Sequence, residues 1–263
     1  RTRDAHHDRA APGSLDVRSI DGSGNHLEDP EHNATHSSLA RSVPAAYDDG
    51  SSTLAGADRR SPRDVSNWVN AQAALVPNPF GTSDYLWQWG QFLDHDIDLT
   101  EGTDPAEFAH IPVTAGDSHF DPYFTGGVVI PFNRSIYDLE TGTDPTNPRP
   151  QLNEVTGWVD ASNVYGSDPE RASALRTNDG TGRLATGAAN LLPDSDGTLP
   201  NATGGSSQVL FLAGDIRANE QLGLAAMHTL FVREHNRLAD RIRRQEPRLV
   251  LRAVGPLEHL QRR

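Results

Sequence analysis

The stretch SDYLWQWGQFLDHDIDLT, residues 83–100, decides the fold of this chain. It opens with Ser83, a residue type that caps helices, and apolar residues then recur at the spacing of one helical stripe. The members of that stripe are Leu86, Trp89, Leu93 and Ile97. The pattern predicts a helix over residues 84–98, with Ser83 as its cap.

One face of this predicted helix gathers polar groups that could do chemistry. Successive helical residues turn by about 100°, so Gln91, Asp94, His95 and Asp98 fall within roughly one third of the circumference. Asp96 points well away from that face and is available for a different task. The geometry predicts two sites that share one helix.

His95 is the candidate general acid–base of this helix. An imidazole held beside carboxylates and among aromatic neighbours suits proton transfer. The alternative is a solvated acidic face with one incidental histidine. The apolar flanks Trp89, Phe92 and Leu93 argue against that alternative.

The composition of the chain predicts a mainly α fold with long irregular loops. Hydrophobic residues make up 35% of the 263 residues, and 23 Gly and 18 Pro interrupt the apolar runs. A second strong helix is predicted over residues 220–244, and a short one over residues 170–175. The apolar stripe of the long helix, which we expect to be buried, consists of Leu224, Met227, Phe231, Leu238 and Ile242.

The charge and the missing cysteines exclude several classes of function. A formal charge of -13 repels phosphate backbones and anionic lipid, so neither nucleic acid nor an anionic membrane surface is an expected partner. Divalent cations are better candidates. The absence of cysteine excludes disulfides and thiolate metal sites within the chain. No apolar window is long enough for a transmembrane helix, and no apolar signal-peptide core follows the start.

Three stretches of the chain resemble the animal-type haem peroxidases of the peroxidase–cyclooxygenase superfamily. WQWGQFLDHDIDLT, residues 87–100, is similar to the distal-helix motif of that family. AGDIRANEQLGLAAMHTLFVREHNRLA, residues 213–239, and TGWVDASNVYGSD, residues 156–168, match in the family order. RSIDGSGNHL and IPFNRS add weaker support. The resemblance implies a partial haem peroxidase fold over residues 18–246.

The resemblance also implies roles for five residues around a haem b group. His95 would take a proton from hydrogen peroxide and return it to the leaving oxygen, while Gln91 would orient water or halide. Arg217 would stabilise charge on the departing oxygen, and peroxide cleavage does need both a base and a fixed cation. Asp94 and Glu220 would be ester-linked to the haem. Without the resemblance, Arg217 and Glu220 fit a surface ion pair at i, i+3 spacing.

The family's calcium site is implied by the third stretch together with the distal helix. Its ligands would be Thr156, the Trp158 carbonyl, Asp160 and Ser162, completed by Asp96. In extended chain, residues two apart face the same way, so these oxygens can converge. Hard oxygen ligands suit calcium. The alternative is a short strand with exposed Thr, Asp and Ser side chains.

We expect a disordered lead-in over residues 1–17 and a tail over residues 247–263 that does not match the family. Pro247 should end the second long helix. Family members continue into further helices that supply the proximal histidine, which this chain lacks. The one histidine of the tail, His259, has the wrong context for that role. Without those helices, the apolar faces around Leu230 and Leu238 should lie partly open.

These observations predict a haem-dependent peroxidase that uses hydrogen peroxide and a small halide or organic reducing substrate. Because the proximal ligand is missing, we expect at most trace turnover from the chain alone. The alternative is an inactive calcium-binding fragment of such a peroxidase. A metallohydrolase built on His95, Asp96 and Asp98 is a weaker alternative, since no second histidine cluster accompanies them. The family resemblance implies secretion.

Overall fold

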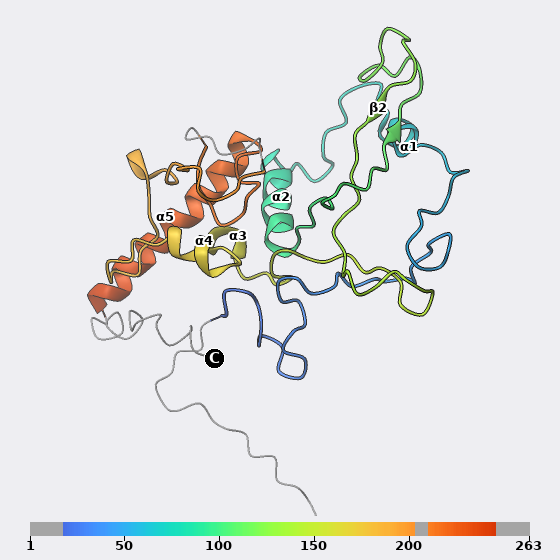
Figure 1. The fold of residues 1–263 in the computed structure, drawn as a ribbon. Helices are drawn as coiled ribbons and strands as arrows, with labels where there is room; N and C mark the ends of the chain where they lie inside the picture. The colour runs from blue at the N-terminus through green and yellow to red at the C-terminus, as the bar shows by residue number, and fades with distance from the viewer. Residues whose placement is uncertain (1–17, 203–209, 246–263) are drawn as a thin grey trace, which may run out of the picture.

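The computed structural model describes residues 18–202 and 210–245. The expectations for residues 1–17 and 247–263, including Pro247 and His259, lie outside the described residues. The helices α2, α3, α4 and α5 gather on one side of the molecule, and long loops with α1 and the short strands form the other side (Figure 1). Few strands are present in the described part, so the mainly α fold with long irregular loops is confirmed.

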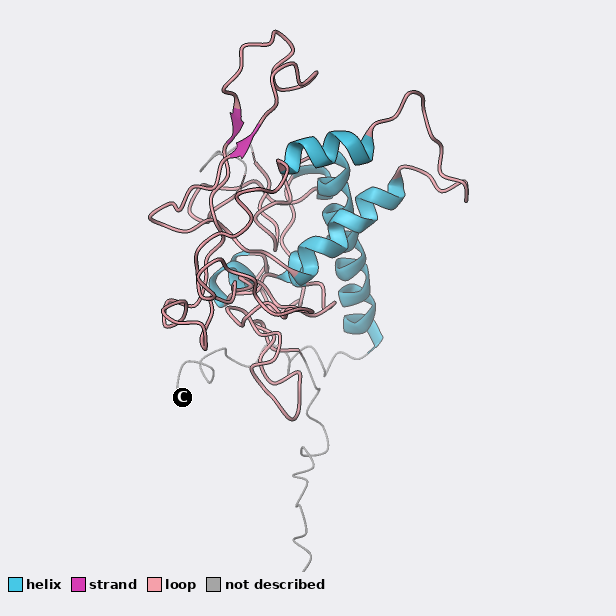
Figure 2. Cartoon of the chain, turned by 90° about the vertical axis from the view of Figure 1, so that its right-hand side faces the viewer, coloured by secondary structure: helices cyan, strands magenta, loops and turns pink. Residues whose placement is uncertain are grey.

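Two helices carry the arrangement. α2 (Tyr85–Ile97) packs against α5 (Leu222–Gln245), and the short α3 (Ser162–Tyr165) contacts both of them. Figure 2 shows the long helices side by side, with the loops packed beyond them. The predictions for residues 84–98 and 220–244 are therefore correct to within two residues at each end. α4 (Pro169–Ala174) likewise matches the short helix expected over residues 170–175.

The hydrophobic core lies where these helices meet the loops that follow α4. Phe92 of α2 stacks on Phe231 of α5, with ring centroids 4.7 Å apart. Burying such aromatic and aliphatic side chains is the main source of stability for the fold. The buried apolar members of this core are Phe92, Val164, Leu175, Leu184, Leu192, Ala213, Ala218, Leu224, Met227 and Val232.

The buried face of α2 differs from the one that its apolar spacing suggests. Phe92, His95 and Asp96 are buried, whereas Leu86 and Trp89 are 53% and 41% exposed. The reason is that other segments pack over His95 and Asp96, while α5 covers the apolar stripe only in part, through the stacking of Trp89 on Phe231. Ser83 is also not the side-chain cap that we expected. The N-cap position is Asp84, and it makes no side-chain capping bond.

The expected buried stripe of α5 is correct only for its first half. Leu224 and Met227 are buried and Phe231 is partly buried, but Leu238 and Ile242 are 41% and 48% exposed. The second half of the helix faces its neighbours through polar side chains, since Asn236 binds the Leu184 backbone and Asp240 pairs with Arg183, so Leu238 and Ile242 meet solvent. The expectation that the faces around Leu230 and Leu238 lie partly open is confirmed.

The loop region contains α1 (Pro62–Asn70), which the sequence did not indicate. Its first turn is closed by the Ser61 hydroxyl, which accepts a hydrogen bond from the Arg63 backbone N–H at 3.2 Å. Arg63 also pairs with buried Asp117 at 2.7 Å, which fixes the helix to a distant loop. The remaining elements are the strands β1 (Ile111–Pro112) and β2 (Val129–Ile130), which pair antiparallel, and η1 (Ala188–Asn190).

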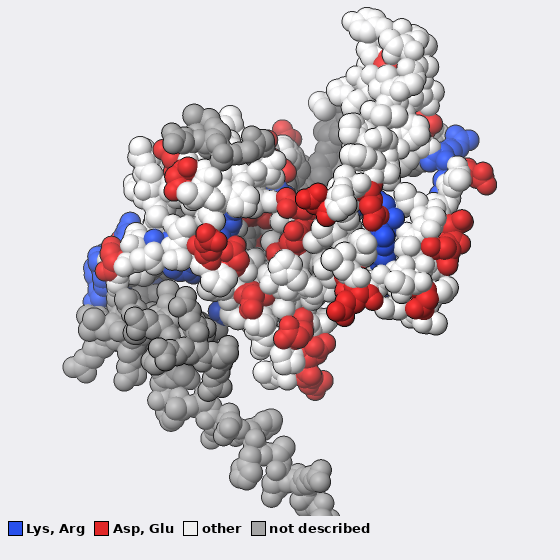
Figure 3. Space-filling model, in the orientation of Figure 1, with Lys and Arg blue, Asp and Glu red and all other residues white. Residues whose placement is uncertain are grey.

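No helix in residues 18–202 or 210–245 combines the length and the apolar character needed to cross a membrane. Acidic side chains are spread over much of the face in Figure 3, and fewer basic ones are visible there. This distribution agrees with the formal charge of -13. A surface of this kind repels phosphate groups.

Candidate active site and cation loop

His95 lies between two carboxylates that come from the segment leading into α5. Its Nδ1 is 3.8 Å from Asp215 Oδ1, and its Nε2 is 3.7 Å from Glu220 Oε2. The residue is only 4% exposed. Burial, and then the charge of Arg217, lower the pKa of His95, although the two carboxylates act in the opposite direction. The imidazole is therefore held in its neutral form near pH 7, in which it can accept a proton.

Arg217 is fixed next to His95 by a two-pronged contact with Asp215. Its Nε and Nη2 donate to the two carboxylate oxygens at 2.9 and 2.8 Å. Nη2 also donates to the Asp98 carbonyl, at the C-terminal end of α2, at 2.7 Å. Nη1 has no hydrogen-bond partner within the part of the chain that the structure describes. The guanidinium is thus anchored through one edge, while the other edge is left to interact elsewhere.

Asp215 is the residue of this site that sequence reasoning missed. It is 2% exposed, and its backbone N–H donates to the Asn163 carbonyl at 2.9 Å. The residue before it must be glycine, because a Cβ on Gly214 would lie 2.5 Å from that carbonyl oxygen. The available signal was a carboxylate two residues before Arg217 in the stretch AGDIR.

The polar face predicted for α2 does contact the segment that leads into α5. Gln91 Nε2 donates to Glu220 Oε2 at 2.7 Å, and Gln221 Nε2 donates to Gln91 Oε1 at 3.0 Å. Asp94 and Glu220 are both exposed at this edge. Burial, and then the charge of Asp94, raise the pKa of the Asp98 carboxyl. The structure therefore brings Gln91, His95, Arg217 and Glu220 together, with Asp94 on the adjoining surface.

The predicted calcium ligands meet on the opposite side of α2. Buried Asp96 accepts hydrogen bonds from the Ala161 and Asn163 backbone N–H groups at 3.0 and 3.2 Å. The Ser162 hydroxyl also donates to it, at 3.2 Å. Asp160, in turn, accepts from the Thr156 hydroxyl at 3.1 Å. The Ser162 backbone N–H joins these two pairs by donating to Asp160 at 2.9 Å, so Asp96, Thr156, Asp160 and Ser162 form one connected cluster.

The charge balance of this cluster fits a cation. Burial raises the pKa of Asp96, and the nearby charge of Asp160 raises it further. Two carboxylates that face each other in a buried place favour a positive partner. Arg18 partly supplies that charge, since its Nη1 lies 3.1 Å from Asp160 Oδ2. The Trp158 carbonyl, the fifth predicted ligand, accepts from the Asp160 N–H at 3.0 Å.

The described residues contain no group of three or more His, Cys, Asp or Glu side chains that could hold a metal ion. The predicted calcium set has only two carboxylates and otherwise relies on hydroxyl and carbonyl oxygens, so this finding does not bear on it. It does weigh against the metallohydrolase alternative. His95 faces Asp215 and Glu220, whereas Asp96 binds the segment around α3, so these two side chains diverge.

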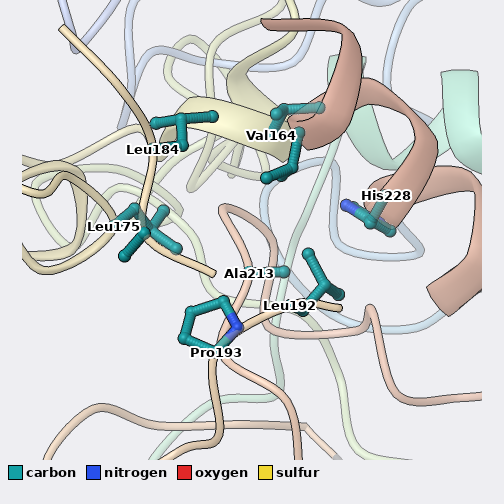
Figure 4. Close-up of a pocket in the computed structure, with 9 residues that line it drawn as sticks. Val164, Leu175, Leu184, Leu192, Pro193, Ala213 and His228 are labelled. Atoms are coloured by element: carbon teal, nitrogen blue, oxygen red, sulfur yellow. The ribbon is translucent and has the colours of Figure 1, made fainter. Parts of the chain in front are cut away.

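A second buried histidine, His228, lies under the site on α5. It is fully buried, and neither ring nitrogen has a hydrogen-bond partner in the described structure. Burial lowers the pKa of His228 to about 4. Its ring borders an apolar cavity of about 10 Å³ whose other labelled lining residues are aliphatic or proline (Figure 4). That volume is close to the least that holds one water molecule.

Comparison with known proteins identifies relatives of this arrangement. A model of the animal haem peroxidase family matches residues 17–250. Human dual oxidase 1 is 36% identical over 246 residues, and golden hamster (Mesocricetus auratus) lactoperoxidase is 34% identical over 270 residues. The matches cover 90% and 88% of this chain. The structure of peroxidase A from Dictyostelium discoideum superposes with a TM-score of 0.75 at 25% identity and covers 89% of this chain.

The chain spans only part of each of these proteins. It covers 16% of dual oxidase 1, 37% of lactoperoxidase and 48% of the peroxidase A structure. The partial haem peroxidase fold predicted from the sequence is therefore confirmed. The matched region includes α2, the loop of residues 156–162 that carries the predicted calcium ligands, and the segment from Asp215 to α5.

Proposed function

This chain belongs to the animal haem peroxidase family, and from that membership we propose that it carries the peroxide-cleaving side of a haem site. The family implies haem as cofactor, hydrogen peroxide as oxidant and a reducing substrate as electron donor. We extend this to a small halide or organic donor acting outside the cell, as the resemblance implies. Bound haem would supply the electrons that cleave the O–O bond.

One observation carries the proposal: a neutral, buried base and a fixed cation stand side by side. His95 Nε2 would accept the proton of hydrogen peroxide, because its pKa is lowered and the ring is neutral near pH 7. The unpartnered Nη1 of Arg217 would donate to the oxygen on which negative charge develops. His95 would then return its proton to the leaving oxygen as water forms. Gln91, at the same edge, would orient water or halide.

The residues at the open edge suit the attachment of haem b. Asp94 on α2 and Glu220 before α5 are exposed carboxylates from two different segments, on the side towards which His95 Nε2 points. Both would form ester links with the haem. Position 221 is Gln, where one branch of the family has methionine, so we expect no sulfonium link. Instead, Gln221 holds Gln91 through a 3.0 Å hydrogen bond.

The loop of residues 156–162, together with Asp96 of α2, would bind calcium. The ligands would be Asp96, Thr156, the Trp158 carbonyl, Asp160 and Ser162. The support is the buried pair of carboxylates and the connected hydroxyl groups described above. Asp160 would have to give up part of its contact with Arg18. Because Asp96 directly follows His95, the ion would also stiffen the helix that carries the base.

A haem titration followed by a peroxidase assay tests the proposal. The purified chain with calcium is titrated with haem by absorbance, and peroxide-dependent oxidation of a phenolic dye is compared with that of free haem. In line with the expectation from the sequence, oxidation by the chain alone should exceed that by free haem by at most a trace. A trace that is lost in His95→Ala, and kept in His119→Ala, supports the proposal. His119 is an exposed histidine of the loop region and serves as the matched control.

Equal oxidation by the wild type and His95→Ala would overturn the assigned role of His95. Absence of haem binding, together with calcium-dependent stabilisation, would favour the alternative of an inactive calcium-binding fragment. Attachment of the haem is read separately, as a haem-sized mass increase on the peptides that contain Asp94 and Glu220 after peroxide treatment. With both links formed, one haem joins these two peptides, whereas Asp94→Asn should leave the haem on the Glu220 peptide alone and Glu220→Gln should leave it on the Asp94 peptide alone.

A further inference from the structure

We propose that Asp215 is the positioning residue of the pair formed by His95 and Arg217. It holds the guanidinium so that Nη1 is the free donor, and it orients the His95 ring so that Nε2 faces the open edge. This inference rests on the proposed function, because it explains how the two groups are aimed. Asp215 itself would touch neither peroxide nor haem.

The contacts of Arg217 show how one carboxylate can aim it. Asp215 accepts from the Arg217 backbone N–H at 2.8 Å and from Nε and Nη2 of the side chain. A two-pronged contact between a planar guanidinium and a carboxylate fixes both the position and the plane of the group. The Asp98 carbonyl holds Nη2 from the other side at 2.7 Å. With Nε and Nη2 engaged, rotation of the fork is blocked and Nη1 is the nitrogen left over.

The same carboxylate lies next to the rear nitrogen of His95. Nδ1 is buried without a hydrogen-bond partner, and Asp215 Oδ1 is 3.8 Å from it. Asp215 is fully buried, whereas the Glu220 side chain beside Nε2 is 37% exposed, so solvent screens the charge of Glu220 more strongly. The less screened charge of Asp215 favours the tautomer with the proton on Nδ1, which leaves the lone pair on Nε2. Nε2 faces the side of Glu220, at 3.7 Å. The base therefore presents its reactive nitrogen to the edge where Gln91 and Glu220 meet.

Asp215 can perform this task because its own position is tightly held. Its N–H is bound to the Asn163 carbonyl, and the Asn163 side chain donates to the Phe92 carbonyl of α2 at 2.7 Å. The carboxylate is thus tied to the same helix that carries His95. Since Gly214 lets the two backbones approach, the segment cannot shift without losing these bonds.

The test measures both aimed groups in the haem-free chain, so that haem binding plays no part. The full chain is labelled with ¹⁵N at arginine and histidine, and the His95 and Arg217 side-chain signals are assigned with His95→Gln and Arg217→Lys. In Asp215→Asn we expect the Arg217 Nε–H to exchange about tenfold faster, because a charge-assisted bond is lost. We also expect the His95 tautomer to change from mainly Nδ1–H to a mixture.

Asp121→Asn is the matched control, because Asp121 is equally buried at 2% exposure and its contacts lie in the loop region. Asp215→Glu keeps the charge and should restore the tautomer in part. If Asp215→Asn leaves both signals as in the wild type, or if Asp121→Asn changes them equally, the proposal is wrong. If Asp215→Asn does not fold, Asp215→Asn with Arg217→Gln carries the tautomer measurement without a buried unpaired cation.

These outcomes are independent of the test of the proposed function. Failure to bind haem would contradict the peroxidase proposal and leave the tautomer result as it stands. Conversely, a His95-dependent peroxidase whose His95 and Arg217 signals ignore Asp215→Asn would keep the proposed function and refute the positioning role.

Discussion

His95 and Asp96 are neighbours on α2 and are almost equally buried, yet they meet opposite surroundings. On the Asp96 side, hydrogen bonds from Ala161, Ser162 and Asn163 surround the carboxylate. On the His95 side, the two ring nitrogens lie 3.8 and 3.7 Å from carboxylate oxygens, too far for a hydrogen bond, so Nε2 keeps its capacity to accept a proton. The comparison teaches that one side of the helix is organised for holding and the other for reacting, because a fully satisfied group has little left to offer a substrate.

The largest effect on stability should come from removing the Asp96 carboxylate, which is fully hydrogen-bonded. Asp96→Ala leaves the Ala161 and Asn163 N–H groups without an acceptor, while the Ser162 hydroxyl keeps the backbone carbonyl of residue 96. We expect unfolding to become easier by about 3 kcal/mol. Urea unfolding followed by circular dichroism measures this change. Asp94→Ala, on the same helix but exposed, is the matched control and should stay within about 0.5 kcal/mol of the wild type. A loss for Asp96→Ala no larger than that of the control would remove the distinction between the two sides.

The pH dependence of stability tests the comparison through His228, the buried histidine of α5 near His95. The pKa of His228 is about 4 in the folded chain, against an ordinary histidine value of 6.5 in the unfolded chain, so its contribution to stability is fully present above pH 6.5. As the pH falls towards 4, the unfolded chain takes up the proton first, and about 3 kcal/mol of stability is lost. Urea unfolding at pH 7 and pH 4.5 measures this loss.

His228→Leu should flatten the acid side of that profile. The slope should not vanish, because the pKa of His95 is also lowered and acts in the same direction. His119→Leu, at an exposed position, serves as the control and should leave the profile unchanged. An acid slope in His228→Leu as steep as in the wild type would show that His228 does not carry it.

Calcium should raise the stability of the folded chain through the Asp96 side of α2. Binding to the folded chain at a hundredfold excess over Kd stabilises it by about 2.7 kcal/mol. Melting curves with calcium and with chelator measure the shift, and Asp160→Asn should reduce it strongly. The control is Asp49→Asn, because Asp49 lies in an exposed loop turn of the loop region. Identical midpoints with calcium and chelator would rule out the calcium site.

The smallest effect on stability is expected at the exposed apolar residues in the second half of α5. Leu238→Gln and Ile242→Gln should each change stability by less than about 0.5 kcal/mol, because both side chains already meet solvent. Leu224→Ala, in the covered half of the same helix, should cost about 3 kcal/mol. Similar losses in the two halves, measured by urea unfolding, would contradict the exposure difference along α5.

Much of the fold and of the candidate site could be predicted from the sequence. Helical periodicity located α2 and α5, because a regular 3.6-residue repeat is a local property of the chain. The same geometry predicted that Asp96 faces away from His95, as the contacts with the α3 region and with Glu220 show. The three matching stretches also identified the family over most of the chain.

Other features could not be read from the sequence. The exposure of Leu86 and Ile242 depends on which segments cover each helix, and periodicity says nothing about coverage. The helix α1 depends on the contact of Arg63 with Asp117, which lies more than fifty residues away. Weak local signals of this kind become helices only when distant partners stabilise them.

The sequence by itself pointed to His95 and Arg217 as the candidate reactive groups, and it located the helix on which His95 lies. Only the tertiary structure decided how they are aimed. Asp215 lies 120 positions from His95 along the chain, yet its carboxylate comes within 3.8 Å of the ring and binds Arg217 through both oxygens. The physical reason is that residue type and helical phase are local properties, whereas the direction of a buried side chain is set by the partners that long-range packing brings to it.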